Sequence, residues 1–199
     1  MYIGKQIPEY LLSKLSITDK SASLYWCDAA NQFSFSASGV PTNFAKLGPR
    51  GQYGSIKQLA HTTFQYPICR LGRKYKYFDR LLLSGVRITR SQKVLLEQGM
   101  LSHIFILSLC LQELDGFEDA TYQCVIGDGM AKMISLIVSN TKSRVLSVNL
   151  RPAMLVDYHF LAKIISPDQI GLITKIEDIE DAQNNSDLKA IFLEADNQN

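Results

Sequence analysis

The ten residues Tyr122-Gln-Cys-Val-Ile-Gly-Asp-Gly-Met-Ala131 decide the fold class of this chain. They predict an apolar strand followed by a turn whose small residues are Gly127, Gly129 and Ala131. A turn without bulky side chains lets a ligand approach the backbone, and the helix that follows presents free N–H groups in its first turn. Because nucleotide-like cofactors are held in this way, the stretch predicts an α/β fold with a cofactor site.

The sequence after the turn completes a strand–helix–strand unit. Residues 130–138 have the apolar spacing of a helix, and Ser139-Asn-Thr141 is expected to end it. Arg144-Val-Leu-Ser-Val148 then predicts a second strand. The residue that closes such a strand, about 20 residues beyond the glycines, normally accepts hydrogen bonds from the ribose of the cofactor. Asn149 occupies this position, and Leu150 follows it.

The spacing of the small residues separates two classes of cofactor. Dinucleotide-binding proteins carry G-x-G-x-x-G/A, and the third small position of that pattern is Lys132 here. The small residue falls one place earlier, at Ala131, which gives G-x-G-x-G/A. That spacing resembles the class I S-adenosylmethionine-dependent methyltransferases, and an NAD-type oxidoreductase is the less favoured alternative.

Residues 125–134 and 146–161 together resemble the putative sugar O-methyltransferase group of that class. The shared features are the glycine-rich turn after the first strand, a Leu-Pro-like step after the second and a helix that bears a tyrosine. The resemblance covers roughly residues 80–199 and implies an α/β, Rossmann-like methyltransferase sheet.

The resemblance also implies an activity and a set of site residues. The cofactor would be S-adenosylmethionine, and its methyl group would pass to a hydroxyl of a sugar or of another sugar-containing acceptor. The residues implied in cofactor binding are Gly127, Asp128, Gly129, Ala131, Asn149 and Leu150.

Two positions depart from the family pattern. Val125 and Asn149 stand where family members usually carry acids. An amide can still bond ribose hydroxyls, but it lacks the stronger charge-assisted hydrogen bond. Asp128 is the remaining acid of the turn, and three roles are open to it: capping the following helix, which we favour, contacting the amino group of the cofactor, or simple exposure to solvent.

A sugar hydroxyl attacks poorly until it is deprotonated, so the reaction needs a general base. Asp196, which follows the last predicted strand, is the first candidate, and His159 on the predicted helix 153–165 is the second. Asp157, Tyr158 and His159 lie on that helix, and for them core or solvent roles are favoured over an approach to the cofactor pocket. Further candidate bases are His61, His103 and Glu194.

The chain is expected to contain two regions. Residues 1–88 predict an irregular, mainly helical region on the substrate side, and residues 89–199 predict a partial, Rossmann-like cofactor-binding domain. Thr89-x-x-Gln92 has the spacing of a capping box and predicts a helix from about Arg90 to Leu114. Two further strands, at residues 169–176 and 189–194, bring the sheet to about four strands, so it is incomplete.

A second function stays open beside the enzyme. A non-catalytic, degenerate relative would keep the methyltransferase fold for binding or for oligomeric assembly. An incomplete sheet leaves an open edge that favours pairing with another chain, so we expect a homo-oligomer.

The composition is that of an ordinary globular protein, with 46% hydrophobic and 20% charged residues. Lys and Arg outnumber Asp and Glu by only two, so nothing supports nucleic acid as a partner. The four cysteines are scattered, which predicts no metal site. The N-terminus lacks a signal-peptide layout, which favours the cytoplasm, and the apolar run 100–111 is too short to span a membrane.

One further cluster is notable. Residues 70–80 interleave cations with aromatic side chains. Such a patch can bind phosphates, although a solvated face of a helix or strand is the favoured interpretation.

Overall fold

The computed structural model describes residues 1–3, 7, 12, 34–42 and 56–195. The chain divides into two compact units, each built from several segments. The sheet unit comprises Met1–Gly48, Cys124–Ala131 and Leu146–Asn199. The helical unit comprises Pro49–Gln123 and Lys132–Val145.

A five-stranded mixed sheet runs through the structure in the order β1-β4-β5-β3-β2. Its strands are β1 (Tyr2–Ile3), β2 (Tyr122–Ile126), β3 (Arg144–Asn149), β4 (Ile170–Ile173) and β5 (Ala190–Glu194). Strand β4 is parallel to β5, and β1 is antiparallel to β4. The residues of β4 are all buried, as expected for a strand whose two faces are both covered.

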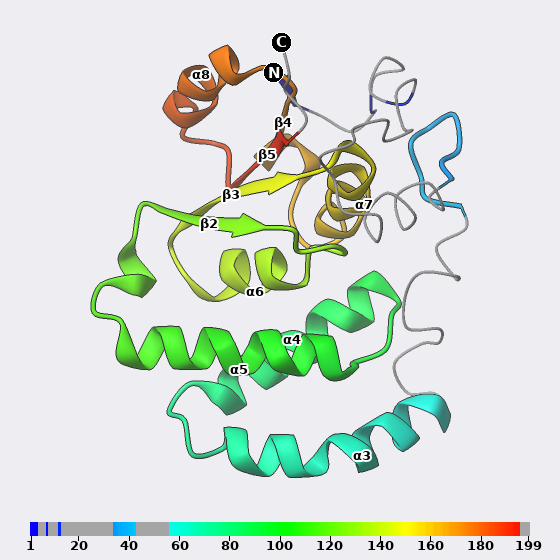
Figure 1. Cartoon of the computed structure of the whole chain (residues 1–199), viewed down its shortest axis with the longest axis vertical. Helices are drawn as coiled ribbons and strands as arrows, with labels where there is room; N and C mark the ends of the chain where they lie inside the picture. The colour runs from blue at the N-terminus through cyan, green and yellow to red at the C-terminus, as the bar shows by residue number, and fades with distance from the viewer. Residues whose placement is uncertain (4–6, 8–11, 13–33, 43–55, 196–199) are drawn as a thin grey trace. The chain divides into compact units, whose positions relative to one another are not determined.

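Two backbone hydrogen bonds show that β2 and β3 are parallel. The N–H of Arg144 donates to the carbonyl of Thr121 (3.0 Å), and the N–H of Gly127 donates to the carbonyl of Val148 (3.1 Å). The paired residues ascend together along both strands, and the two arrows point the same way in Figure 1. Their carboxyl ends, where the turn and Asn149 lie, therefore meet at one edge of the sheet.

Six described α-helices accompany the sheet. In the helical unit they are α3 (Ile56–Gly72), α4 (Phe78–Gln92), α5 (Gln98–Glu113) and α6 (Lys132–Asn140). In the sheet unit they are α7 (Arg151–Leu161) and α8 (Ile179–Asn184). Short 3₁₀ turns lie at η2 (Phe117–Asp119), η3 (Pro167–Gln169) and η4 (Ile176–Asp178). None of the described helices combines the length and the apolar character that crossing a membrane requires.

The helical unit is held by direct packing of its helices. Helix α4 contacts α5 and α6, and α5 also contacts α3. Gly85 of α4 makes the close approach possible, since a Cβ there would lie 2.7 Å from Cδ1 of Ile104 on α5. The side chains of Leu81 and Ile104 are buried, which places an apolar core between these helices.

The α/β class predicted from the sequence is confirmed, and the last two predicted strands are present as β4 and β5. The short strand β1 was not predicted. The strand order also differs from the doubly wound order 3-2-1-4, in which the first strand lies inside the sheet. Here β2, the first strand of the unit that bears the turn, has β3 as its one neighbour among the described strands.

The single helix predicted from about Arg90 to Leu114 is wrong, because two helices meet there. Lys93 has the left-handed conformation (φ 59°) and ends α4. The hydroxyl of Thr89 donates to the carbonyl of Gly85 inside α4, so Thr89 does not cap the start of a helix. The cap of α5 is Glu97, whose carboxylate accepts from the N–H of Gly99 (2.9 Å).

Candidate functional site

The glycine turn between β2 and α6 has an unusual backbone. Gly127, Gly129, Met130 and Ala131 all have positive φ, at 69°, 54°, 87° and 52°. A Cβ on either glycine would meet no atom within 4 Å, so the backbone is open there. A left-handed conformation costs a residue other than glycine about 1–2 kcal/mol, so Met130 and Ala131 need support from their surroundings.

Asp157 on α7 supplies that support. Its Oδ1 accepts a hydrogen bond from the backbone N–H of Ala131 (2.7 Å), and its Oδ2 accepts one from Nδ2 of Asn149 (2.9 Å). The residue is completely buried. One carboxyl group therefore joins the turn after β2 to the end of β3, and it does so within the sheet unit.

The charge state of this carboxyl group is also unusual. Burial, and next the negative charge of Asp128, raise the pKa of Asp157 to about 8. Hydrogen bonds from Ala131, Asn149 and Met130 act in the opposite direction, but they do not outweigh the burial. Two acids thus lie at an open glycine turn, and such a group favours a proton or a cation nearby.

Asn149, the predicted ribose-binding residue, lies at the end of β3 as expected from the sequence. Its side chain is 6% exposed. Its Nδ2 donates to Asp157, and its Oδ1 accepts from the N–H of Leu150 (2.9 Å). Because both ends of the amide are engaged inside the protein, a ribose would have to compete with these partners.

The start of α7 and the end of β5 are joined by an ion pair that sequence reasoning did not anticipate. Nε and Nη2 of Arg151 donate to Oε1 and Oε2 of Glu194, each at 2.7 Å. The N–H of Ala195 also donates to the carbonyl of Asn149 (2.9 Å). The pair is largely buried, with exposures of 16% and 6%. Both carboxylate oxygens of Glu194 are thus engaged by Arg151, which weakens Glu194 as a candidate base.

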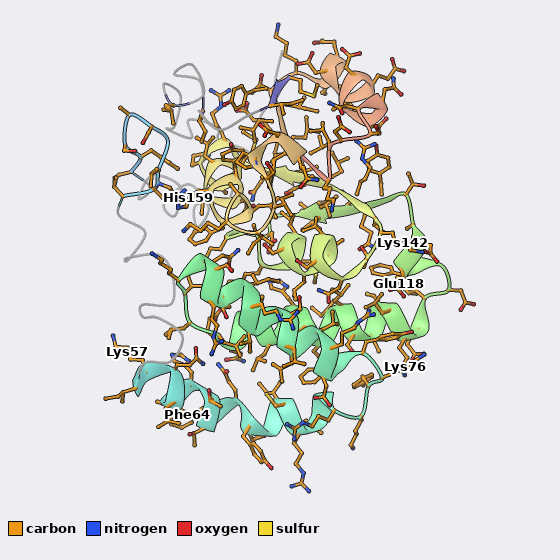
Figure 2. The ribbon with its side chains drawn as sticks, turned by 180° about the vertical axis from the view of Figure 1, so that it is seen from behind. Lys57, Phe64, Lys76, Glu118, Lys142 and His159 are labelled. Atoms are coloured by element: carbon orange, nitrogen blue, oxygen red, sulfur yellow. The ribbon has the colours of Figure 1, made fainter. Side chains whose placement is uncertain are left out.

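The structure separates His159 from the turn. His159 follows Asp157 by two residues on α7, so the two side chains point to nearly opposite sides of the helix, about 160° apart. Burial, and next the positive charge of Lys163, lower the pKa of His159 to about 4. Its ring packs edge-on against Phe160, and Figure 2 labels the residue. Asp196, the first candidate base, lies outside the described residues.

Lys132, which counts against the dinucleotide pattern, is the first residue of α6. Its Nζ lies 2.5 Å from Oε1 of Glu97, inside the helical unit. Within the described ranges, no group of three or more His, Cys, Asp or Glu side chains is placed to hold a metal ion. The candidate site is therefore the turn with Asp128, Asp157 and Asn149. No protein-family model, curated protein or solved structure matches the chain.

Proposed function

We propose that this chain binds S-adenosylmethionine at the turn from Gly127 to Ala131 and is a methyltransferase-like protein that acts on a sugar or sugar-containing acceptor. The observation that carries the proposal is the acid pair at the open turn. Burial, and next the negative charge of Asp128, raise the pKa of Asp157, and the two glycines leave the neighbouring backbone uncovered.

The sign of the charge separates the two cofactor classes. S-adenosylmethionine carries a sulfonium and an ammonium group, whereas the pyrophosphate of a dinucleotide is an anion. A cation beside two acids stabilises their ionised forms, and a pyrophosphate there would destabilise them. The acid pair of Asp128 and Asp157 therefore supports the assignment that the G-x-G-x-G/A spacing suggested.

Each residue of the site has a part in this proposal. Gly127 and Gly129 admit the ligand to the backbone, while Asp157 holds Ala131 in its left-handed conformation. Asn149 and Leu150 border the site at the end of β3. The cofactor supplies an electrophilic methyl group, and the chain contributes orientation of the reactants. Asp196 remains the proposed base.

One observation favours the second function, a protein that binds without catalysing. His159 points away from the turn and has a pKa of about 4, and Glu194 is held by Arg151. Two of the candidate bases are therefore poorly suited to remove a proton from a hydroxyl group. In this alternative the turn still binds the cofactor, but no methyl group is transferred.

Isothermal titration calorimetry tests the binding. We expect S-adenosylmethionine to bind in the micromolar range, S-adenosylhomocysteine to bind more weakly because its sulfur is uncharged, and NAD to give no heat. Binding should release a proton near pH 7, because a nearby cation lowers the pKa of Asp157. Tighter binding of NAD, or no heat with millimolar S-adenosylmethionine, would overturn the proposal.

A labelling experiment separates the two functions. The protein is incubated with methyl-labelled S-adenosylmethionine and a panel of free and nucleotide-linked sugars. Label in a sugar product that disappears in the Asp196→Asn variant supports the enzyme. Binding of the cofactor with no transfer to any sugar supports the non-catalytic alternative.

A further inference from the structure

Helix α3 is polar on its buried side and apolar on its exposed side. Its buried side includes Gln58 and Gln65, each 5% exposed. Five of its large apolar side chains face outward instead, which reverses the usual pattern of a surface helix. These are Ile56 (89% exposed), Leu59 (68%), Phe64 (85%), Tyr66 (59%) and Leu71 (56%).

The exposed apolar residues follow one line along the helix. Residues 56, 60, 64, 67 and 71 are separated by intervals of four, four, three and four, and all of them are exposed. Residues three or four apart share one face of a helix. This line, together with Leu59 and Tyr66, forms a ridge roughly 22 Å long at 1.5 Å per residue. We call it the α3 ridge.

The polar side of α3 is anchored to the helical unit. Nε2 of Gln58 donates to the carbonyl of Leu96 (2.9 Å), and the N–H of Leu96 donates to Oε1 of Gln58 (2.7 Å). Helix α3 also packs on α5. The helix is therefore fixed with its ridge outward, because rolling the ridge inward would break both bonds to Leu96.

The charges around the ridge have one sign. Residues 56–78 contain five Lys or Arg and no Asp or Glu. The whole chain carries only +2, so the remainder carries −3 (2 minus 5). Arg73 pairs with Asp79 at 3.5 Å, but both side chains are more than half exposed, and such pairs contribute little. Lys57, at the start of the ridge, is labelled with Phe64 in Figure 2.

These charges decide between possible occupants of the ridge. In an antiparallel pair of ridges centred near Phe64, Lys57 of one copy would lie beside Arg70 of the other. Like charges would then oppose self-association. An exposed apolar ridge that is flanked by Lys and Arg suits a lipid surface. There the apolar groups enter the headgroup boundary, and the cations bind the phosphates.

We propose that the α3 ridge docks the protein on an anionic membrane surface. Phe64, Ile56 and Leu71 enter the interface, while Lys57, Arg70 and the cations after the helix bind the anionic headgroups. The ridge belongs to the helical unit, whereas the turn belongs to the sheet unit.

Vesicle sedimentation tests the docking. We expect the full chain to sediment with phosphatidylcholine vesicles that contain phosphatidylserine, and not with phosphatidylcholine alone. Added salt should weaken binding. Phe64→Glu and Leu59→Glu should each weaken it about tenfold or more, since each places a charge in the interface. The matched control is Ile176→Glu on η4, where an apolar side chain of the sheet unit is 61% exposed.

Three outcomes would overturn the proposal. One is wild-type protein that stays in solution with phosphatidylserine vesicles at low salt. Another is Ile176→Glu weakening binding as much as Phe64→Glu. The third combines two results: light scattering shows a dimer that Phe64→Glu converts to monomer, and the wild-type protein does not bind the vesicles. That outcome would assign the ridge to contact with a second copy of the chain. Thermal unfolding followed by circular dichroism confirms that each variant is folded.

Discussion

At the scale of single residues, Asp157 connects the parts of the candidate site. Its carboxyl group accepts from Ala131 in the turn and from Asn149 at the end of β3. The sequence placed Asp157 on a helix after the second strand. However, no local sequence signal distinguishes an acid that bonds to a turn 26 residues earlier from an ordinary acid of a helix. The contact depends on how α7 returns over the sheet, which is a long-range property of the fold.

The raised pKa of Asp157 predicts a pH-dependent stability. The pKa of Asp157 is about 8 in the folded protein, against an ordinary value of 3.8 that applies to the unfolded chain. The folded state therefore binds the proton of this carboxyl group more tightly than the unfolded state does. Asp157 therefore makes the free energy of unfolding fall as the pH rises from about 4 to about 8. Urea unfolding at pH 5 and at pH 8 measures this contribution. Between these two pH values, the free energy of unfolding should fall less in the Asp157→Asn variant than in the wild type.

The control is Asp181→Asn, which changes an exposed acid of α8. It should keep the wild-type difference between the two pH values. An Asp157→Asn variant whose stability changes with pH just as the wild type does would show that Asp157 titrates normally in the folded protein.

At the scale of elements, local signals predicted the strand–turn–helix–strand unit and the strands β4 and β5. The glycines of the turn and the apolar periods are contained in short stretches, so one sequence suffices to find them. The break between α4 and α5 was missed for a physical reason. Lys93 adopts the left-handed conformation that usually calls for glycine at the end of a helix, so its residue type gave no signal.

Gln58 is expected to stabilise the attachment of α3. Gln58→Leu removes both hydrogen bonds to Leu96 and leaves a buried N–H and a carbonyl without these partners. An unsatisfied buried group costs about 1–3 kcal/mol, so urea unfolding should show a loss of at least about 2 kcal/mol. Gln98→Leu, at an exposed position of α5, is the matched control and should cost little. Equal stabilities of the two variants would contradict this role.

At the scale of the whole molecule, the order of the strands was the feature furthest from the sequence. Which strands pair depends on contacts between distant segments, and an apolar run shows only that a strand exists. As a result β2, with its glycine turn, is the last strand in the order of the described strands instead of lying inside the sheet. The candidate site is consequently built from β2, β3 and the acid of α7.

The position of β2 suggests where the predicted homo-oligomer would form. Among the described strands β2 pairs with β3 alone, and its Ile126 is 79% exposed. A free, apolar edge favours pairing with a second copy. Light scattering should show a dimer that Ile126→Lys converts to monomer, whereas Ile176→Lys should not. A monomeric mass at every protein concentration would contradict the prediction.

The central claim is that the turn binds S-adenosylmethionine, and calorimetry on a matched pair of glycine variants tests it most directly. Gly127 and Gly116 both have positive φ and open space where a Cβ would lie, so alanine costs each about 1–2 kcal/mol of stability. Only Gly127 belongs to the turn. We expect wild type and Gly116→Ala to bind S-adenosylmethionine alike and Gly127→Ala to bind at least about tenfold more weakly. Equal binding by all three proteins, or binding by none, would contradict the claim.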